Sequence, residues 1–490
     1  MPFNSYPYFI FLATAVLGFR LLEKSALTGR RVFLLLASYA FYAWWRTDFL
    51  LLLGCSTLVN YALGREIEQR RARQTDRRTY LIAGLVFNLG LIATFKYDTL
   101  FVGTADQLLG LGLPIPHFFL PLAISFFTFE QISYLVDADA GKTHGYTLLD
   151  YALFVAYFPH LIAGPIVRHN DLIPQFRASR AAQNDDLATG ITLFTIGLAK
   201  KTLIADNLAP FADAIFNAAG RGVHLGPTDA WLGTLFFAFQ IYFDFSAYSD
   251  MALGSSVMLG IRLPVNFHSP YKAASIIEFW RRWHISLSAF LRDYLYIPLG
   301  GNRHGRGRRY LNLFITMFLG GLWHGANWTF MLWGGLHGLY LSINHAFRRA
   351  TRGLVPSPVL RLPLHIASVA LTFAATTLAW IVFRAPDLAS ARNVAGGLFG
   401  GGHSAVVSFS PLAAITLALL TVIVWFMPNS MELMWKHWPA LPSPYPDQPV
   451  EPAQRFAWSP TPLNAAAYGL ICIIAILALS NLKPFIYFQF

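Results

Sequence analysis

Long apolar segments separated by short polar loops dominate this chain. A helix needs roughly 17 to 25 apolar residues to cross a bilayer. The pattern predicts such helices near 6–22, 31–45, 48–63, 80–97, 116–136, 148–166, 187–205, 229–261, 275–300, 311–345, 363–383, 411–427 and 463–482. Because several of these regions are shorter or longer than one span, we expect about ten to twelve crossings plus re-entrant or interfacial helices. No internal repeat of the kind found in many transporters is visible.

The composition agrees with this pattern. Of 490 residues, 55% are hydrophobic and only 13% are charged, whereas soluble proteins carry about 25% charged residues. We therefore predict an all-α polytopic membrane protein with a single membrane domain over residues 1–490. Residues 6–22 have no basic residue before them and no cleavage pattern after them, so we expect a retained span rather than a signal peptide.

The net charge of +12 lies mainly in short loops between apolar segments. Such clusters mark cytoplasmic loops, which argues against nucleic acid as a partner and leaves membrane lipids as the surroundings. The loop 65–78 contains six arginines and three acids, and the loops 302–309 and 347–353 are also basic. Counting spans from these loops places both termini on the extracytoplasmic side.

Three arginines disagree with this simple alternation. Arg168, Arg177 and Arg180 fall where an outer loop is expected. Half-inserted helices in this region would explain them.

Two further features bound the chain's chemistry. Residues 439–462 contain eight prolines, which predicts an extended connector rather than a packed element. Cys55 and Cys472 both lie in apolar segments, so neither a disulfide framework nor a metal site is predicted.

The segment 310–347 carries the strongest candidate for chemistry. Only 36 residues separate the basic loops that flank it, which is short for two full spans and favours a hairpin with its bend inside the membrane. The expected turn residues are Gly320, Gly321, Gly325 and Asn327. His324 lies at this bend, and an ionisable residue at such depth is a functional candidate.

A second candidate is His284, in the segment 278–301. This segment mixes Arg281, Arg282 and other charges with apolar residues, which is typical of an interfacial helix or of one that lines a polar tunnel. An interfacial histidine with a satisfied hydrogen bond is the alternative for His284.

Several long segments together resemble one known family. They are "FWRRWHISLSAFLRDYLYIPLGG", "GGLWHGANWTFMLWGGLHG", "LPLAISFFTFEQISYLVD", "FPHLIAGPIVR", "YFDFSAYSDMALG" and "NFHSPY". The chain is similar, from about residue 5 to its end, to the membrane-bound O-acyltransferase (MBOAT) family. The resembling branch contains the alginate O-acetyltransferase membrane subunit and the D-alanyl transfer protein of teichoic acids.

The resemblance implies a funnelled membrane fold in the bacterial inner membrane, with the family's two active-site positions falling on His324 and His284. It also implies acyl transfer from a cytoplasmic donor to an extracytoplasmic acceptor. The expected donor substrate is acetyl-CoA, with no bound cofactor. The expected product is an O-acetylated envelope polysaccharide, reached through a periplasmic or extracellular partner of the serine-hydrolase type.

The chemistry agrees with this assignment, because a neutral imidazole can remove the proton from an attacking hydroxyl near neutral pH. We therefore expect His324 to act as general base and His284 to orient the acyl group or stabilise the oxyanion. An acyl-histidine intermediate stays open.

Other residues are weaker candidates for substrate binding. Asp244 and Asp250 would line the funnel or bind acceptor, or else be structural carboxylates. Asn327 would cap the turn or hold His324, and is a candidate for substrate binding. Trp323, which precedes His324, is another such candidate. Arg281 and Arg282 would attract donor phosphates or lipid headgroups.

The chain ends in "FIYFQF", within the tail 483–490. A short membrane partner in the teichoic acid system resembles this ending and carries the acyl group on its tyrosine, which makes Tyr487 a candidate acyl carrier. An aromatic anchor at the membrane interface is the alternative. A lipid acyltransferase of the same fold, a polysaccharide or lipid exporter, and a non-catalytic scaffold also stay open for the whole chain.

Overall fold

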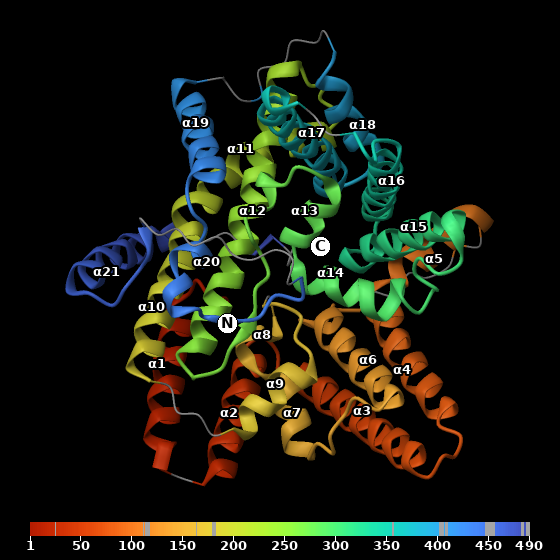
Figure 1. Ribbon diagram of the computed structural model, residues 1–490, viewed down its shortest axis with the longest axis vertical. Coiled ribbons are helices and arrows are strands. Elements are labelled where there is room, and N and C mark those ends of the chain that lie inside the picture. The colour runs from red at the N-terminus through yellow and green to blue at the C-terminus, as the bar shows by residue number, and fades with distance from the viewer. Residues whose placement is uncertain are drawn as a thin grey trace.

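The computed structural model describes residues 1–24, 26–110, 112, 118–162, 164–178, 183–354, 357–400, 406, 410–445, 456–481 and 485–486. Within these ranges the chain is almost entirely helical, and the only strands are β1 (Leu263–Pro264) and β2 (Ala440–Leu441), which pair in parallel. Figure 1 shows the helices gathered around the long helix α12 and the short helices α13 and α14. This architecture confirms the prediction of an all-α fold.

The N-terminal third forms one side of the molecule. Its helices are α1 (Tyr6–Leu21), α2 (Leu27–Ala43), α3 (Asp48–Ala72), α4 (Arg78–Lys96), α5 (Asp98–Leu109) and α6 (Ile124–Ala140). Buried amides join three of them: Asn60 donates to Gln131 at 2.5 Å, and Asn88 donates to Asn60 at 2.6 Å. Hydrogen bonds between polar side chains hold apolar helices together where the hydrophobic effect does not.

The predicted span 148–166 is wrong. The chain instead forms three short helices, α7 (Leu148–Ala156), α8 (Phe158–Leu161) and α9 (His169–Arg177). Because α7 has nine residues, it is only about 14 Å long and cannot cross a bilayer. The sequence here is apolar because the segment is buried in protein, as the near-complete burial of α7 shows.

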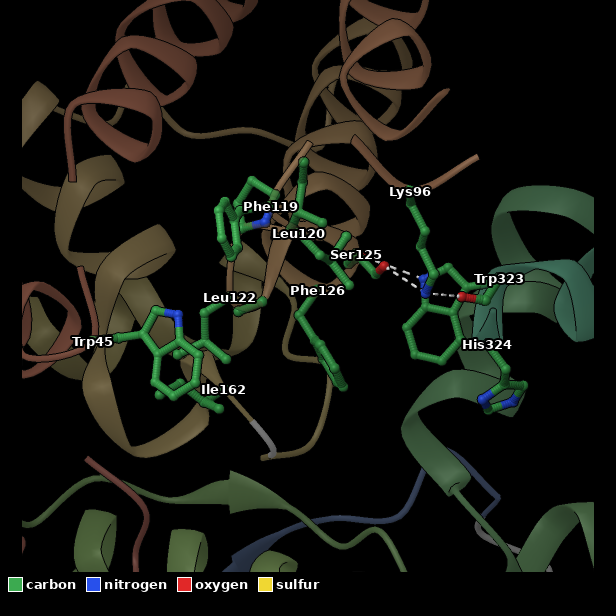
Figure 2. Close-up of a pocket in the computed structure, with 13 residues that line it drawn as sticks. Trp45, Lys96, Phe119, Leu120, Leu122, Ser125, Phe126, Ile162, Trp323 and His324 are labelled. Carbon is green, nitrogen blue, oxygen red and sulfur yellow. Dashed lines mark hydrogen bonds between the residues drawn. The ribbon is translucent and has the colours of Figure 1, made fainter. Parts of the chain in front are cut away.

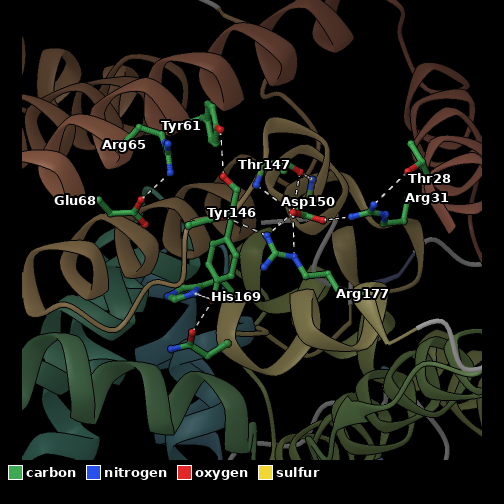
Figure 3. Close-up of polar contacts among 12 residues, drawn as sticks. Thr28, Arg31, Tyr61, Arg65, Glu68, Tyr146, Thr147, Asp150, His169 and Arg177 are labelled. Carbon is green, nitrogen blue, oxygen red and sulfur yellow. Dashed lines mark hydrogen bonds and ion pairs between the residues drawn. The ribbon is translucent and has the colours of Figure 1, made fainter.

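Asp150 of α7 accounts for one of the three misplaced arginines, Arg177, whereas Arg168 pairs with Asp293 and Arg180 lies outside the described residues. Its carboxylate forms ion pairs at 2.6 Å with Arg31, at the start of α2, and with Arg177, at the end of α9, and it closes a capping box with Thr147 (Figure 3). Arg177 therefore lies at the same end of the molecule as Arg31, the end predicted to be cytoplasmic. This arrangement agrees with half-inserted helices.

The centre of the fold is α12 (Pro227–Val257), which is buried along nearly its whole length. It packs against α10 (Asn184–Ala199), the π-helical segment η2 (Lys200–Ala205) and α11 (Asp206–Gly220), which together continue the predicted helix 187–205 in both directions. Glycines allow this close approach, because a Cβ on Gly197 would lie 2.6 Å from the carbonyl oxygen of Ala247.

The segment that carries His284 is broken. The single helix expected over 278–301 is divided into α13 (Ile276–Arg282), α14 (Ile285–Leu291) and the π-helical turn η4 (Arg292–Tyr296). The break lies at His284, whose φ of 43° is left-handed. Such a backbone is uncommon for a residue other than glycine and is often found at functional sites.

The predicted hairpin is present as α15 (Gly305–His324) and α16 (Trp328–Ala350). These helices have 20 and 23 residues because they continue through the arginine-rich flanks, so their length alone does not place the bend inside a membrane. Gly320 and Gly321 are not turn residues, contrary to the prediction, but lie within α15. A Cβ on Gly321 would lie 2.2 Å from the carbonyl oxygen of Phe330, so this glycine lets the two helices touch.

The C-terminal third contains α17 (Pro358–Arg384), α18 (Leu388–Gly397), α19 (Pro411–Phe426), α20 (Ser430–Leu433) and α21 (Pro462–Leu477), with short 3₁₀ turns between elements. In the described ranges three helical segments are long and apolar enough to cross a membrane, and three others are apolar but shorter. They are Arg78–Lys96, Asn184–Gly220 and Pro358–Arg384, then Tyr6–Leu21, Pro411–Phe426 and Pro462–Leu477.

The proline-rich connector is not wholly unpacked. Its residues Ala440, Tyr445 and Trp458 are buried, and Ala440 pairs with Leu263 through β2. The expectation that it is extended without packing is therefore wrong for these ends, while 446–455 lie outside the described residues.

Candidate active site

His324 is the last residue of α15 and is only 5% exposed. The final carbonyl groups of a helix have no partner within it, and here two side chains from the end of α4 supply partners. Lys96 donates to the carbonyl oxygen of Trp323 at 2.6 Å, and Tyr97 donates to that of Leu322 at 2.8 Å. These contacts hold the end of α15, and therefore His324, in place.

A cavity of about 310 Å³ adjoins His324. Figure 2 shows Lys96 directed between Ser125 and Trp323 in its wall, with His324 at one side and Trp45 and Phe119 at the other. Trp45 follows α2 and Lys96 ends α4, so the cavity lies beside the helix ends that are predicted to be extracytoplasmic. We call it the outer cavity.

His284 is completely buried, and its ring has a defined hydrogen-bond partner. Its Nδ1 lies 3.1 Å from Oδ1 of Asn266, and that oxygen also accepts the backbone N–H of Ser286. An amide oxygen accepts, so Nδ1 carries the proton and Nε2 carries a lone pair. This Nε2 has no hydrogen-bond partner among the described residues.

Trp323 brings the two histidines together. Its indole lies 5.0 Å from the ring of His324 and 6.2 Å from that of His284, measured between ring centres. The two histidines, 40 residues apart in sequence, therefore flank one aromatic ring. Trp323, a substrate-binding candidate from the sequence, also lines the outer cavity.

A second cavity, of about 540 Å³, lies at the opposite end of α15. We call it the inner cavity, because its lining residues include Asn302, Arg309 and His345, beside the loops predicted to be cytoplasmic. Three arginines and no acidic residue line it in the described part of the chain: Arg281, Arg292 and Arg309. Such a wall favours anionic groups.

Few side chains separate the inner cavity from His324. Trp280 lines that cavity, its ring lies 5.8 Å from the ring of Trp333, and Trp333 lies 5.1 Å from His324. Trp280 also donates to Nδ1 of His337, which fixes that buried histidine as a support for the tryptophan rather than as part of either cavity wall.

The adjacent arginines have different surroundings. Arg281 lines the inner cavity, with its guanidinium over the ring of Tyr445 at 5.6 Å. Arg282 forms an ion pair with Glu278 at 2.8 Å and donates to the carbonyl of His268. The structure therefore associates Arg281, and not Arg282, with the cavity.

The remaining candidates are held by polar contacts. Asn327 begins α16 by accepting the N–H of Thr329, and it donates to the carbonyl of Pro386. Asp250 pairs with Lys200 at 2.6 Å and accepts from Ser430. Asp244 pairs with Lys201 at 2.6 Å. Tyr487 lies outside the described residues.

Three residues near the site were missed from the sequence. Lys96 resembles any lysine at the end of an apolar helix, and Lys201 resembles any charge at the end of a span. Asn266 carried a usable signal, because it begins the segment "NFHSPY". The sequence showed that these residues exist, but not that distant elements bring Lys96 beside His324, Asn266 beside His284 and Lys201 beside Asp244.

Comparison with known proteins identifies the family of this chain. The sequence model of the MBOAT, membrane-bound O-acyltransferase family matches residues 35–381. A probable alginate O-acetylase of Pseudomonas putida is 39% identical over 94% of this chain and 94% of its own. A peptidoglycan O-acetyltransferase of Helicobacter pylori is 42% identical over 80% of this chain and 78% of its own.

A more distant relative points the same way. A teichoic acid D-alanyltransferase of Streptococcus thermophilus is 28% identical over 54% of this chain and 68% of its own. The two relatives described above are acetyl-transferring proteins by name, and this one transfers another small acyl group. The chain is therefore a member of the membrane-bound O-acyltransferase family and an O-acyltransferase.

Proposed function

We propose that the protein moves an acetyl group from acetyl-CoA at the cytoplasmic face to an extracytoplasmic acceptor, for O-acetylation of an envelope polysaccharide. The observation that carries this proposal is the position of His324, which lines the outer cavity and lies close to the inner cavity. A buried histidine that adjoins one cavity and is two tryptophan rings from the other suits a reaction between substrates from opposite sides.

In the proposed first step, the phenol oxygen of Tyr487 attacks the thioester carbonyl carbon of acetyl-CoA. A C–O bond forms, the C–S bond breaks, and His324 passes the phenol proton to the departing sulfur. A phenol with a pKa near 10 is a weak nucleophile at neutral pH, so it needs such a base. The aryl ester that results is more reactive than an alkyl ester, which suits onward transfer.

The proposed role of His284 depends on its tautomer. The contact with Asn266 leaves a lone pair on Nε2, so this atom can accept a proton but cannot donate one until it has done so. Orientation of the acyl group needs no proton, whereas oxyanion stabilisation by His284 requires prior protonation.

The acceptor side of the proposal rests on the relatives. Alginate and peptidoglycan appear in their names, and both are envelope polysaccharides outside the cytoplasmic membrane. We propose that a separate serine-hydrolase-type transferase takes the acetyl group from Tyr487 and places it on the sugar.

The proposal is tested by incubating purified protein with acetyl-CoA that carries an isotopic label in the acetyl group. Intact mass is expected to rise by one acetyl group, and peptide analysis is expected to place it on Tyr487. Label on another residue would contradict the carrier assignment, and donor hydrolysis without any labelled protein would contradict a covalent relay.

The inner cavity gives a prediction about the donor. Arg281→Ala is expected to raise KM for acetyl-CoA about tenfold, because it removes a cation that pairs with phosphate, worth roughly 1.5 kcal/mol or more. Steady-state kinetics over a range of acetyl-CoA concentrations measure this effect. Arg282→Ala is the matched control, since its guanidinium pairs with Glu278 instead of lining the cavity. Equal changes in the two variants would remove the inner cavity from the donor site.

A further inference from the structure

Two residues of the C-terminal tail pack against α12, and we call this contact region the tail seat. The backbone N–H of Ile486 donates to Oδ2 of Asp244 at 2.9 Å. The ring of Phe485 lies 4.0 Å from that of Tyr248 and 5.7 Å from that of Phe245, between centres. Both tail residues are nearly inaccessible, with 1% and 2% exposure. One charged oxygen and two aromatic rings thus hold two tail residues deep in the protein.

The carboxylate that accepts this N–H is itself held by a buried lysine. Oδ1 of Asp244 lies 2.6 Å from Nζ of Lys201, which also pairs with Asp206 at 2.7 Å. Lys201 is 1% exposed. A buried ion pair is costly unless its remaining lone pairs are satisfied, and in Asp244 the second oxygen is satisfied by the tail.

The tail seat lies next to the candidate active site. The ring of Phe245 lies 4.7 Å from the ring of His284, edge to face. Phe245 therefore contacts the tail on one side and a candidate active-site histidine on the other. The tail residue that follows Ile486 is Tyr487.

We propose that Asp244, oriented by Lys201, is a positioning residue that docks the C-terminal tail beside His284. The inference rests on the proposed function only in that the docked tail would present Tyr487 to acyl transfer. The docking of the tail does not depend on acyl transfer. It gives Asp244 a role other than acceptor binding or a purely structural one.

The test uses the full-length chain with Cys55 and Cys472 replaced by alanine and with Ile486→Cys as a reporter. This substitution keeps the backbone N–H and places a thiol in the tail seat. Alkylation by a maleimide is expected to be slow. Asp244→Asn is expected to speed it about ten- to hundredfold, because the one remaining oxygen pairs with Lys201 and the amide NH₂ group, which cannot accept, faces the Ile486 N–H. Unchanged labelling in Asp244→Asn would overturn the proposal.

Asp250→Asn is the matched control. Asp250 lies on the same helix and pairs with Lys200 of the same π-helical segment, but it holds Ser430 rather than the tail. Labelling of the reporter thiol is expected to stay slow in this variant. Equal acceleration in both variants would mean that loss of any such ion pair loosens the fold, and it would also overturn the assignment.

A variant in the tail avoids disturbing the buried ion pair. Ile486→Pro removes the N–H donor, and Ile486→Ala keeps it. Carboxypeptidase digestion followed by intact mass is expected to remove the tail faster from the proline variant than from the alanine variant. Equal digestion rates would contradict the hydrogen bond as the docking contact.

Tyr487→Phe separates the docking from the proposed function. If labelling of the reporter thiol still depends on Asp244 in this background while transfer is unaffected by the loss of the phenol, the docking stands and the carrier role fails. If transfer requires Tyr487 but labelling is independent of Asp244, the carrier role stands and the docking fails.

Discussion

We expect His324→Ala to abolish acyl transfer while leaving a folded membrane protein, and no other variant should have a larger effect. Removal of a general base costs about 10²- to 10⁴-fold in rate. Among the described residues that line the two cavities, the only other histidine is His345, which contacts Arg309 near the start of α15. Release of CoA from acetyl-CoA and label transferred to the acceptor measure the loss.

Two controls make the His324 result interpretable. His324→Gln keeps a polar side chain of similar size at the end of α15 and is expected to be as inactive as the alanine variant, with unchanged yield and melting temperature. His437→Ala changes a histidine that packs against Trp458, away from both cavities, and is expected to keep activity. Wild-type turnover in His324→Ala would remove the general-base assignment.

Tyr487→Phe is expected to reduce transfer to the acceptor to the background rate, although it deletes one oxygen atom. The acyl group would be bound covalently to the phenol oxygen, and phenylalanine has no atom that can carry it. An interfacial anchor would tolerate the change, because phenylalanine keeps the apolar ring. Label on the acceptor, measured with the partner transferase present, decides between the two roles.

The matched control for Tyr487 is Tyr468→Phe, the same chemical change on α21. Tyr468 lies on the last helix and contacts neither the outer nor the inner cavity, so normal transfer is expected. Normal transfer in Tyr487→Phe as well would leave the tail as an anchor and would redirect the search for a carrier to the histidines.

His324→Ala and Tyr487→Phe together also distinguish an acyl-histidine from an acyl-tyrosine. If His324 carries the acyl group first, labelled protein should accumulate on His324 in Tyr487→Phe. If His324 acts only as a base, neither variant should retain label. The open choice between these mechanisms therefore has a direct readout in peptide mass.

Local sequence was sufficient for the features that depend on composition and nearest neighbours. Long apolar segments require a membrane because their side chains cannot all be covered by a soluble fold. The hairpin around His324 followed from the short distance between two basic loops, since like-charged loops tend to lie on one side. Motifs such as "GGLWHGANW" also identified the family without knowledge of the fold.

Hydrophobicity alone misled where burial in protein replaces burial in lipid. Residues 148–166 are apolar enough to suggest a span, but they form short helices inside the protein. Gly320 and Gly321 suggested a turn because glycine is common in turns, but they lie at a helix contact. The same apolar sequence can be buried in lipid or in protein, and the same glycines can form a turn or a helix contact. The neighbouring elements in the fold decide which of these structures forms.

By itself, then, the sequence determined the membrane class and the family, and it predicted His324 and His284 as site residues. Only the tertiary structure decided their surroundings: Lys96 bonds the end of α15, Trp323 lies between the histidines, and Asp244 of α12 accepts a hydrogen bond from the C-terminal tail. The physical reason is the distance along the chain. The contact between Ile486 and Asp244 joins residues 242 positions apart, and neither apolar periodicity nor local turn chemistry reports on such a pairing.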